Sequence, residues 1–268
     1  MSVHFILVRF ISNKYNEAWR FFHIGCYKFN DQRSKFQLGV ILYNNLISKE
    51  ISKIPNPQAK ACQLFEEIIT SSHIGSPDGQ RNLVFCAAYN LGRAYHQGYG
   101  INPSLDDALR CFLLAANNGD PNASVSAQTA LGYLYSGPEI RDLQKAFQWH
   151  SDACGNGSVE SQAALGVMYL YGIGVKENRE NALFCLSEAS ARGSIMVSCD
   201  SFVSTPECIQ TFQYRAMSMA CFLYALCLRS GKGVQKDELL ASQLFSKSIE
   251  WDPLLAARYA RLVIAGEL

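Results

Sequence analysis

The same short pattern occurs at least five times in this chain with a fixed internal spacing. It reads Ala-x3-Leu-Gly-x2-Tyr at residues 87–95 and 127–135, and Ser-x3-Leu-Gly-x2-Tyr at 161–169. An earlier copy at 34–42 and a degenerate copy at 220–228 keep the spacing. Residues at i, i+4 and i+8 share one stripe of a helix, so each copy predicts a helix.

A second pattern follows each copy of the first. It reads Ala-x2-Cys-x3-Ala-Ala-x2-Gly at 108–119, and related copies occupy 146–157, 182–193 and, more loosely, 61–69. Residues 16–21 look like the same element, from a unit whose first half is short. Gly-x-Gly loops at 98–101, 172–175 and 231–234 supply helix stops with positive φ. The alternation of the two patterns along the chain predicts an all-α fold, an α-solenoid of helix-turn-helix repeats.

The spacing of the patterns also predicts the domain organisation. Residues 1–30 are expected to form a partial N-terminal helical repeat, and residues 31–252 the solenoid, with an irregular insert at about 194–210. Residues 253–268 are expected to form a C-terminal cap.

Glycine stands inside the first helix of several units, at positions 39, 92, 132 and 166. Since glycine costs about 1 kcal/mol relative to alanine in a helix, its recurrence indicates a gain elsewhere. We expect close approach of the paired helix, with alanines at the facing positions. Gly132→Leu should therefore overpack the helix pair and destabilise the protein by roughly 1–3 kcal/mol.

Composition narrows the possible functions. Apolar residues make up 49% of the chain and charged residues 18%, which is typical of a folded protein. The net charge of +1 gives no electrostatic reason to expect nucleic acid. The longest nearly apolar run, at 216–228, is too short for a membrane span, and we see no secretory signal. We expect a cytoplasmic protein without direct membrane insertion, whose ten cysteines are reduced, buried thiols.

Motifs for catalysis or metal binding are absent from the sequence. It contains no H-E-x-x-H, S-x-x-K or G-x-S-x-G, and its cysteines lack zinc-site spacing. Trp149 is expected in the core and His150 on a wetter face. We therefore predict a non-enzyme without catalytic, cofactor-binding or metal-binding residues and without a cofactor. A thiol or serine hydrolase is the alternative of another class.

The surface of the first helices is the candidate binding site. Opposite the repeat stripe lie Asn90, Arg93 and Gln97, and the position of Arg93 holds Tyr133 in the next unit. Further on, the same position holds Val167 and Leu226, so the row also fits a helix that is buried on both sides. We predict that Asn90, Arg93, Gln97 and Tyr133 contact a peptide, with Arg93 pairing a carboxylate.

The motifs resemble those of Sel-like repeats, which are relatives of tetratricopeptide repeats. The resemblance covers about residues 31–252 and implies a scaffold that binds protein segments. More narrowly, residues 87–95, 123–128 and 149–157 are similar to the megalin-binding adaptor family. That resemblance implies binding of the cytoplasmic tail of an endocytic lipoprotein receptor of the megalin type. An adaptor of the endoplasmic reticulum is the alternative within the Sel-like proteins.

Overall fold

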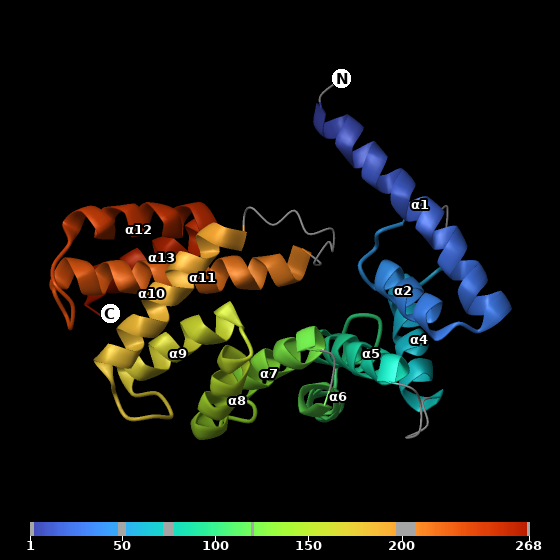
Figure 1. Cartoon of the computed structure of the whole chain (residues 1–268), viewed down its shortest axis with the longest axis horizontal. Coiled ribbons are helices and arrows are strands. Elements are labelled where there is room, and N and C mark those ends of the chain that lie inside the picture. The colour runs from blue at the N-terminus through green and yellow to red at the C-terminus, as the bar shows by residue number, and fades with distance from the viewer. Residues whose placement is uncertain (1–2, 48–51, 72–77, 119–120, 197–206, 267–268) are drawn as a thin grey trace. The chain divides into compact units, whose positions relative to one another are not determined.

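The computed structural model describes residues 3–47, 52–71, 78–118, 121–196 and 207–266. Every regular element in these ranges is a helix (Figure 1). By contacts the chain divides into two compact units, Met1–Ala127 and Gln128–Leu268. The helices are, in chain order, α1 (Val3–Phe29), α2 (Gln32–Tyr43), α4 (Pro57–Ser71), α5 (Asp78–Gln97), α6 (Leu105–Asn118), α7 (Pro121–Ser136), α8 (Leu143–Gly155), α9 (Val159–Tyr171), α10 (Arg179–Met196), α11 (Glu207–Ser230), α12 (Glu238–Trp251) and α13 (Pro253–Ala265).

The predicted helix-turn-helix repeats are confirmed, and the fold is an α-solenoid. The first pattern lies on α2, α5, α7, α9 and α11, which we call the first helices. The second pattern lies on α4, α6, α8 and α10, and α12 takes the same place after α11; we call these five the second helices. First and second helices of one repeat pack together, as α2 does with α4, α5 with α6, α9 with α10 and α11 with α12.

Short polar side chains fix where many helices begin. Asp31, Asp142 and Ser158 each accept a hydrogen bond from the backbone N–H three residues later, at 2.8, 3.0 and 3.1 Å. Asp237 and Asp252 do the same at the start of α12 and α13. Each cap satisfies an N–H group that the first turn of a helix leaves without a partner.

The repeated glycines are points of close approach between the helices of a pair, as predicted. A Cβ atom on Gly132 would lie 2.6 Å from the imidazole of His150, and one on Gly166 would lie 2.7 Å from the side chain of Leu186. The prediction that alanines face these glycines is wrong. Each glycine instead faces a larger side chain, which stands four positions after the first alanine of the second pattern. The pairs are Phe65 over Gly39, Phe112 over Gly92, His150 over Gly132 and Leu186 over Gly166. Glycine is required because a large side chain needs its space.

This geometry sharpens the expected effect of Gly132→Leu. The added side chain must displace the His150 ring, so we still expect a loss of roughly 1–3 kcal/mol in unfolding free energy. Chemical denaturation would measure the loss. Gly155→Leu is the control, because Gly155 is exposed and no atom lies within 4 Å of a Cβ built there. Equal losses in the two variants would contradict the close-packing explanation.

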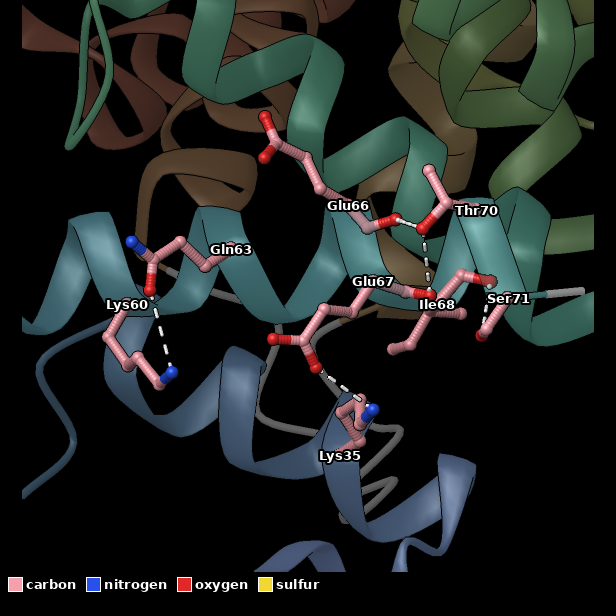
Figure 2. Close-up of polar contacts among 8 residues, drawn as sticks. All are labelled: Lys35, Lys60, Gln63, Glu66, Glu67, Ile68, Thr70 and Ser71. Atoms are coloured by element: carbon pink, nitrogen blue, oxygen red, sulfur yellow. Dashed lines mark hydrogen bonds and ion pairs between the residues drawn. The ribbon is translucent and has the colours of Figure 1, made fainter.

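In unit 1, α2 and α4 are joined by an ion pair as well as by apolar packing (Figure 2). Lys35 Nζ lies 3.0 Å from Glu67 Oε2; the lysine side chain is 9% exposed and the glutamate 51%. Elsewhere on α4, Lys60 Nζ donates to Gln63 Oε1, and the Thr70 hydroxyl donates to the Glu66 carbonyl, as Figure 2 also shows. The Lys35–Glu67 pair therefore neutralises a lysine that is largely out of solvent.

The ends and the insert of the predicted solenoid can be located only in part. One helix, α1, covers most of the predicted partial repeat at 1–30, and α13 begins at Pro253 and packs on α11 and α12. Residues 197–206 of the predicted irregular insert lie outside the described residues, while its edges at 194–196 and 207–210 are helical. The three domain boundaries stay predictions.

Candidate functional site

The four residues predicted to contact a peptide belong to different units. Asn90, Arg93 and Gln97 lie on α5 in unit 1, and Tyr133 lies on α7 in unit 2. In unit 1, Arg93 and Gln97 contact Tyr43, the last residue of α2, and Asn90 contacts Arg93. Unit 2 places Tyr133 against His150. These are two separate local environments.

Arg93 is largely buried by aromatic side chains. Its guanidinium carbon lies 5.4 Å from the ring centre of Tyr43 and 5.8 Å from that of Tyr89, and the residue is 8% exposed. Arg93 Nη1 also donates to Asn90 Oδ1 at 3.4 Å, and Asn90 Nδ2 donates to the Cys86 carbonyl at 2.9 Å. Stacking on two rings stabilises the cation and holds both tyrosines in place. The geometry favours Arg93 as a positioning residue over a direct partner for a ligand carboxylate.

Beside Arg93 lies a group of amides and tyrosines, of which Asn45, Gln97 and Tyr99 are exposed, Gln58 is half-buried and Tyr43 is buried. The Tyr43 hydroxyl donates to Gln97 Oε1 at 3.2 Å, and the Tyr43 ring meets Tyr99 edge-on at 5.3 Å. The Tyr99 hydroxyl accepts from Asn45 Nδ2 at 3.0 Å and from Gln58 Nε2 at 3.2 Å. We call these residues the Tyr99 surface; its members are Tyr43, Asn45, Gln58, Gln97 and Tyr99.

Sequence reasoning found only Gln97 of the Tyr99 surface. A usable signal was present, because Tyr99 is the middle residue of the first Gly-x-Gly loop, where the other loops hold Ile173 and Lys232. The link from Tyr43 to Gln97 spans 54 residues, so no local spacing shows it.

In unit 2, Tyr133 is 43% exposed, and its ring meets the His150 ring edge-on at 4.9 Å. The expectation that His150 lies on a wetter face is wrong, because it is 1% exposed beneath Gly132, while Trp149 is half-buried. His150 Nδ1 lies 3.1 Å from the Ser161 hydroxyl, which donates to Thr129 Oγ1 at 3.1 Å. Burial lowers the pKa of His150 to about 4, so the imidazole is neutral near pH 7.

The other members of the predicted row are core residues. Val167 and Leu226 are half-buried and pack against the apolar cluster of Ala163, Leu186 and Ala216. In this part of unit 2 the row matches a helix that is covered on both sides, the alternative left open by the sequence. Tyr133 is the exposed member of the row in unit 2.

The sequence model of the Sel1 repeat matches four segments, residues 87–120, 125–158, 159–194 and 218–250, which together cover just over half of the chain. The chain belongs to the Sel1 repeat family. Proteins of this family are typically non-enzymatic scaffolds that bind other proteins. The predicted Sel-like resemblance is confirmed at this level.

Two solved structures share the fold of this Sel1-repeat chain. A Sel1 repeat protein from Oxalobacter formigenes superposes with a TM-score of 0.66 at 18% identity, over 92% of this chain and 81% of that one. The protective antigen c5321 of uropathogenic Escherichia coli gives 0.53 at 22% identity, over 85% and 48%. At such identities the likeness shows the fold alone.

Among curated proteins, a rat protein named "DAP3-binding cell death enhancer 1" is similar to part of the chain. It is 31% identical over 93 residues, which are 35% of this chain. The chain spans only 18% of the length of that relative. The similarity therefore concerns a part of this chain and a small part of the relative.

The cysteines of this Sel1-repeat protein are packing residues where the structure describes them. Eight are free thiols, and five of these are buried: Cys26, Cys62, Cys185, Cys221 and Cys227. Burial raises the pKa of Cys62, Cys185 and Cys221 to about 11. A nucleophilic thiol needs a lowered pKa, so these residues are unsuited to thiol catalysis. The described ranges also contain no group of three metal-ligating side chains and no helix able to span a bilayer.

A thiol titration of the native protein tests this interpretation. We expect the five buried thiols to react slowly with a disulfide reagent near pH 7, because burial and raised pKa values leave little accessible thiolate. Unfolding in denaturant should make all ten react rapidly. If one of these five thiols reacts at the unfolded rate in the native state, that result would contradict the prediction and reopen the thiol hydrolase alternative.

Proposed function

We propose that this protein is a non-enzymatic adaptor that binds an extended segment of another protein at the Tyr99 surface. Asn90 is proposed as a further contact and Arg93 as the residue that positions Tyr43. Tyr133 of unit 2 is proposed as a peptide contact in its own separate environment. The observation that carries the proposal is that the exposed side chains of Asn45, Gln97 and Tyr99 gather beside the buried Tyr43 and the half-buried Gln58.

The chemistry of the Tyr99 surface suits a peptide. Tyr99 is 40% exposed and offers a rigid ring together with a hydroxyl, while Asn45 and Gln97 are exposed amides that can donate and accept. Tyrosine and amide side chains are the usual adaptable contacts of binding surfaces. Solenoids present such side chains along stacked repeats, which fits a ligand in extended conformation.

Two partners merit direct testing. The similarity of residues 87–95, 123–128 and 149–157 to the megalin-binding adaptor family supports the cytoplasmic tail of a megalin-type receptor. The partial similarity to the rat relative, whose name refers to DAP3, supports DAP3 as the second partner. We rank the receptor tail first, because it is a flexible segment of the kind that the surface fits.

The test is a binding titration with synthetic peptides that tile a megalin-type receptor tail, and with purified DAP3. We expect one tail peptide to bind, and the Gln97→Ala/Tyr99→Ala variant to bind it at least about tenfold more weakly. Tyr171→Ala is the matched control, since Tyr171 is 46% exposed on α9 and should bind like wild type. If wild type and both variants bind the tail peptide with equal affinity, the site lies elsewhere on the protein. If wild type binds DAP3 and no tail peptide, DAP3 replaces the receptor tail as the proposed partner.

A further inference from the structure

A line of hydrogen bonds in unit 2 leads from a buried histidine to a carboxylate. His150 Nδ1 lies 3.1 Å from Ser161 Oγ, which donates to Thr129 Oγ1 at 3.1 Å. Thr129 Oγ1 in turn lies 2.9 Å from Ser158 Oγ, which donates to Glu160 Oε2 at 3.2 Å. Because a hydroxyl has one proton to donate, Thr129 is the donor to Ser158, and all three hydroxyls direct their protons toward Glu160. The line fixes one oxygen of the carboxylate.

The second oxygen of this carboxylate, Glu160 Oε1, is available to a ligand. Within the described ranges the side chain of Glu160 has Ser158 as its only hydrogen-bond partner, and no lysine or arginine forms an ion pair with it. Glu160 is half-buried in the first turn of α9, where the helix dipole favours a negative charge. The site thus holds a partly desolvated negative charge that a ligand cation would neutralise.

An exposed tyrosine ring lies next to this carboxylate. Tyr133 follows Thr129 by one turn on the same face of α7 and is 43% exposed. Desolvation, and after it the charge of Glu160, raises the pKa of the Tyr133 hydroxyl, which agrees with the short path between the two side chains. The His150 ring that Tyr133 meets is neutral near pH 7 and adds no positive charge.

Unit 1 contains an example of the cation that fits such a tyrosine. Arg93 takes the place of Tyr133 in the repeat of α5, and its guanidinium carbon lies 5.4 and 5.8 Å from the ring centres of Tyr43 and Tyr89. In the described part of the chain no lysine or arginine lies over the Tyr133 ring. A guanidinium stacks on an aromatic ring and also forms directed hydrogen bonds to a carboxylate, which favours arginine over lysine as the ligand.

We propose that Tyr133 and Glu160 together bind an arginine side chain of a partner protein. The guanidinium lies on the tyrosine ring and donates to Glu160 Oε1. Both residues belong to unit 2, so the site is separate from the Tyr99 surface. The inference rests on the part of the proposed function that makes Tyr133 a peptide contact, and it adds the chemistry of the segment that binds there.

The test is a calorimetric titration of the intact protein with three blocked alanine pentapeptides, whose central residue is arginine, lysine or citrulline. Citrulline has the shape of arginine without its charge. Wild type should bind the arginine peptide at least about tenfold more tightly than the citrulline peptide, with the lysine peptide between them. Glu160→Gln keeps an acceptor for Ser158 and should remove most of this difference. Tyr133→Ala should weaken the arginine peptide at least about threefold.

Two further variants keep the test specific. Glu188→Gln is the matched control, because Glu188 is also half-buried but lies on α10, and it should bind like wild type. Gln97→Ala/Tyr99→Ala should keep the preference for arginine, whether or not it loses a receptor-tail peptide. Loss of the preference in that variant would place the arginine at the Tyr99 surface and overturn the proposal.

Three other results would also overturn it. The first is equal affinity of wild type for the arginine and citrulline peptides, or no binding of either up to about 10 mM. The second is a preference for arginine that survives Glu160→Gln. The third is unchanged binding by Tyr133→Ala. Circular dichroism and melting temperatures like those of wild type would show that each variant is folded.

Discussion

Gly174→Ala should lower the free energy of unfolding by roughly 3–5 kcal/mol. Gly174 has φ of +70°, a conformation that costs a residue with a Cβ about 1–2 kcal/mol. A Cβ there would also lie 2.6 Å from the carbonyl carbon of Leu143, in the first turn of α8. Because the obstacle is backbone, no side-chain rotation can relieve it, and the loop must move away from the preceding repeat.

Gly157→Ala separates the two causes. Gly157 has φ of +96°, but no atom lies within 4 Å of a Cβ at this position. Only the conformational cost applies, so a loss of about 1 kcal/mol is expected. Urea midpoints of the two variants and wild type would measure the difference. Similar urea midpoints for Gly174→Ala and Gly157→Ala would show that the close contact with α8 adds nothing to the loss of unfolding free energy.

The same contact recurs in unit 1, which explains the second glycine of the Gly-x-Gly loops. A Cβ on Gly100 would lie 2.7 Å from the backbone nitrogen of Ala59, near the start of α4. At Gly233 the neighbour is the flexible Leu183 side chain, at 3.1 Å. The second glycine thus lets a loop touch the second helix of the preceding repeat, with the tightest fit at Gly100 and Gly174.

The sequence predicts the helices and their pairing, because one stripe of side chains per helix is a local property. Glycine at 39, 92, 132 and 166 correctly indicates close approach. Which side chain fills the space is a property of the other helix, and here the sequence interpretation is wrong. The largest error is the expectation that His150 lies on a wetter face. Histidine is polar, so the sequence favours a surface position, whereas His150 is buried at the position that Phe65 and Phe112 occupy in other repeats.

The candidate site is less predictable than the fold. Helix geometry places Asn90, Arg93 and Gln97 on one side of α5, and the structure keeps them together. The burial of Arg93 depends on Tyr43, which belongs to the preceding repeat and is 50 positions earlier in the sequence. The division of the chain falls within α7, where the repeat pattern is intact, so no local signal indicates it.

His150 is the residue from which we expect the strongest dependence of stability on pH. In the unfolded chain an imidazole titrates with a pKa near 6.5, whereas burial in the folded protein lowers the pKa of His150 to about 4. Between these values the unfolded chain binds a proton that the folded protein does not. Stability is therefore complete above pH 6.5 and falls as the pH drops toward 4. The expected loss is about 3 kcal/mol.

His150→Phe isolates this contribution from the carboxylates that titrate in the same range. Phenylalanine fills the equivalent place over Gly39 and Gly92, so it should fit above Gly132. The Ser161 hydroxyl loses its contact with His150 Nδ1 but keeps Thr129. Urea denaturation of both proteins at a series of pH values from 7 to 4 measures the difference. The wild type should lose about 3 kcal/mol more than the variant, all of it below pH 6.5. If the unfolding free energies of the two proteins fall in parallel as the pH drops, His150 is protonated in the folded protein as readily as in the unfolded chain. The imidazole would then be hydrated in solution.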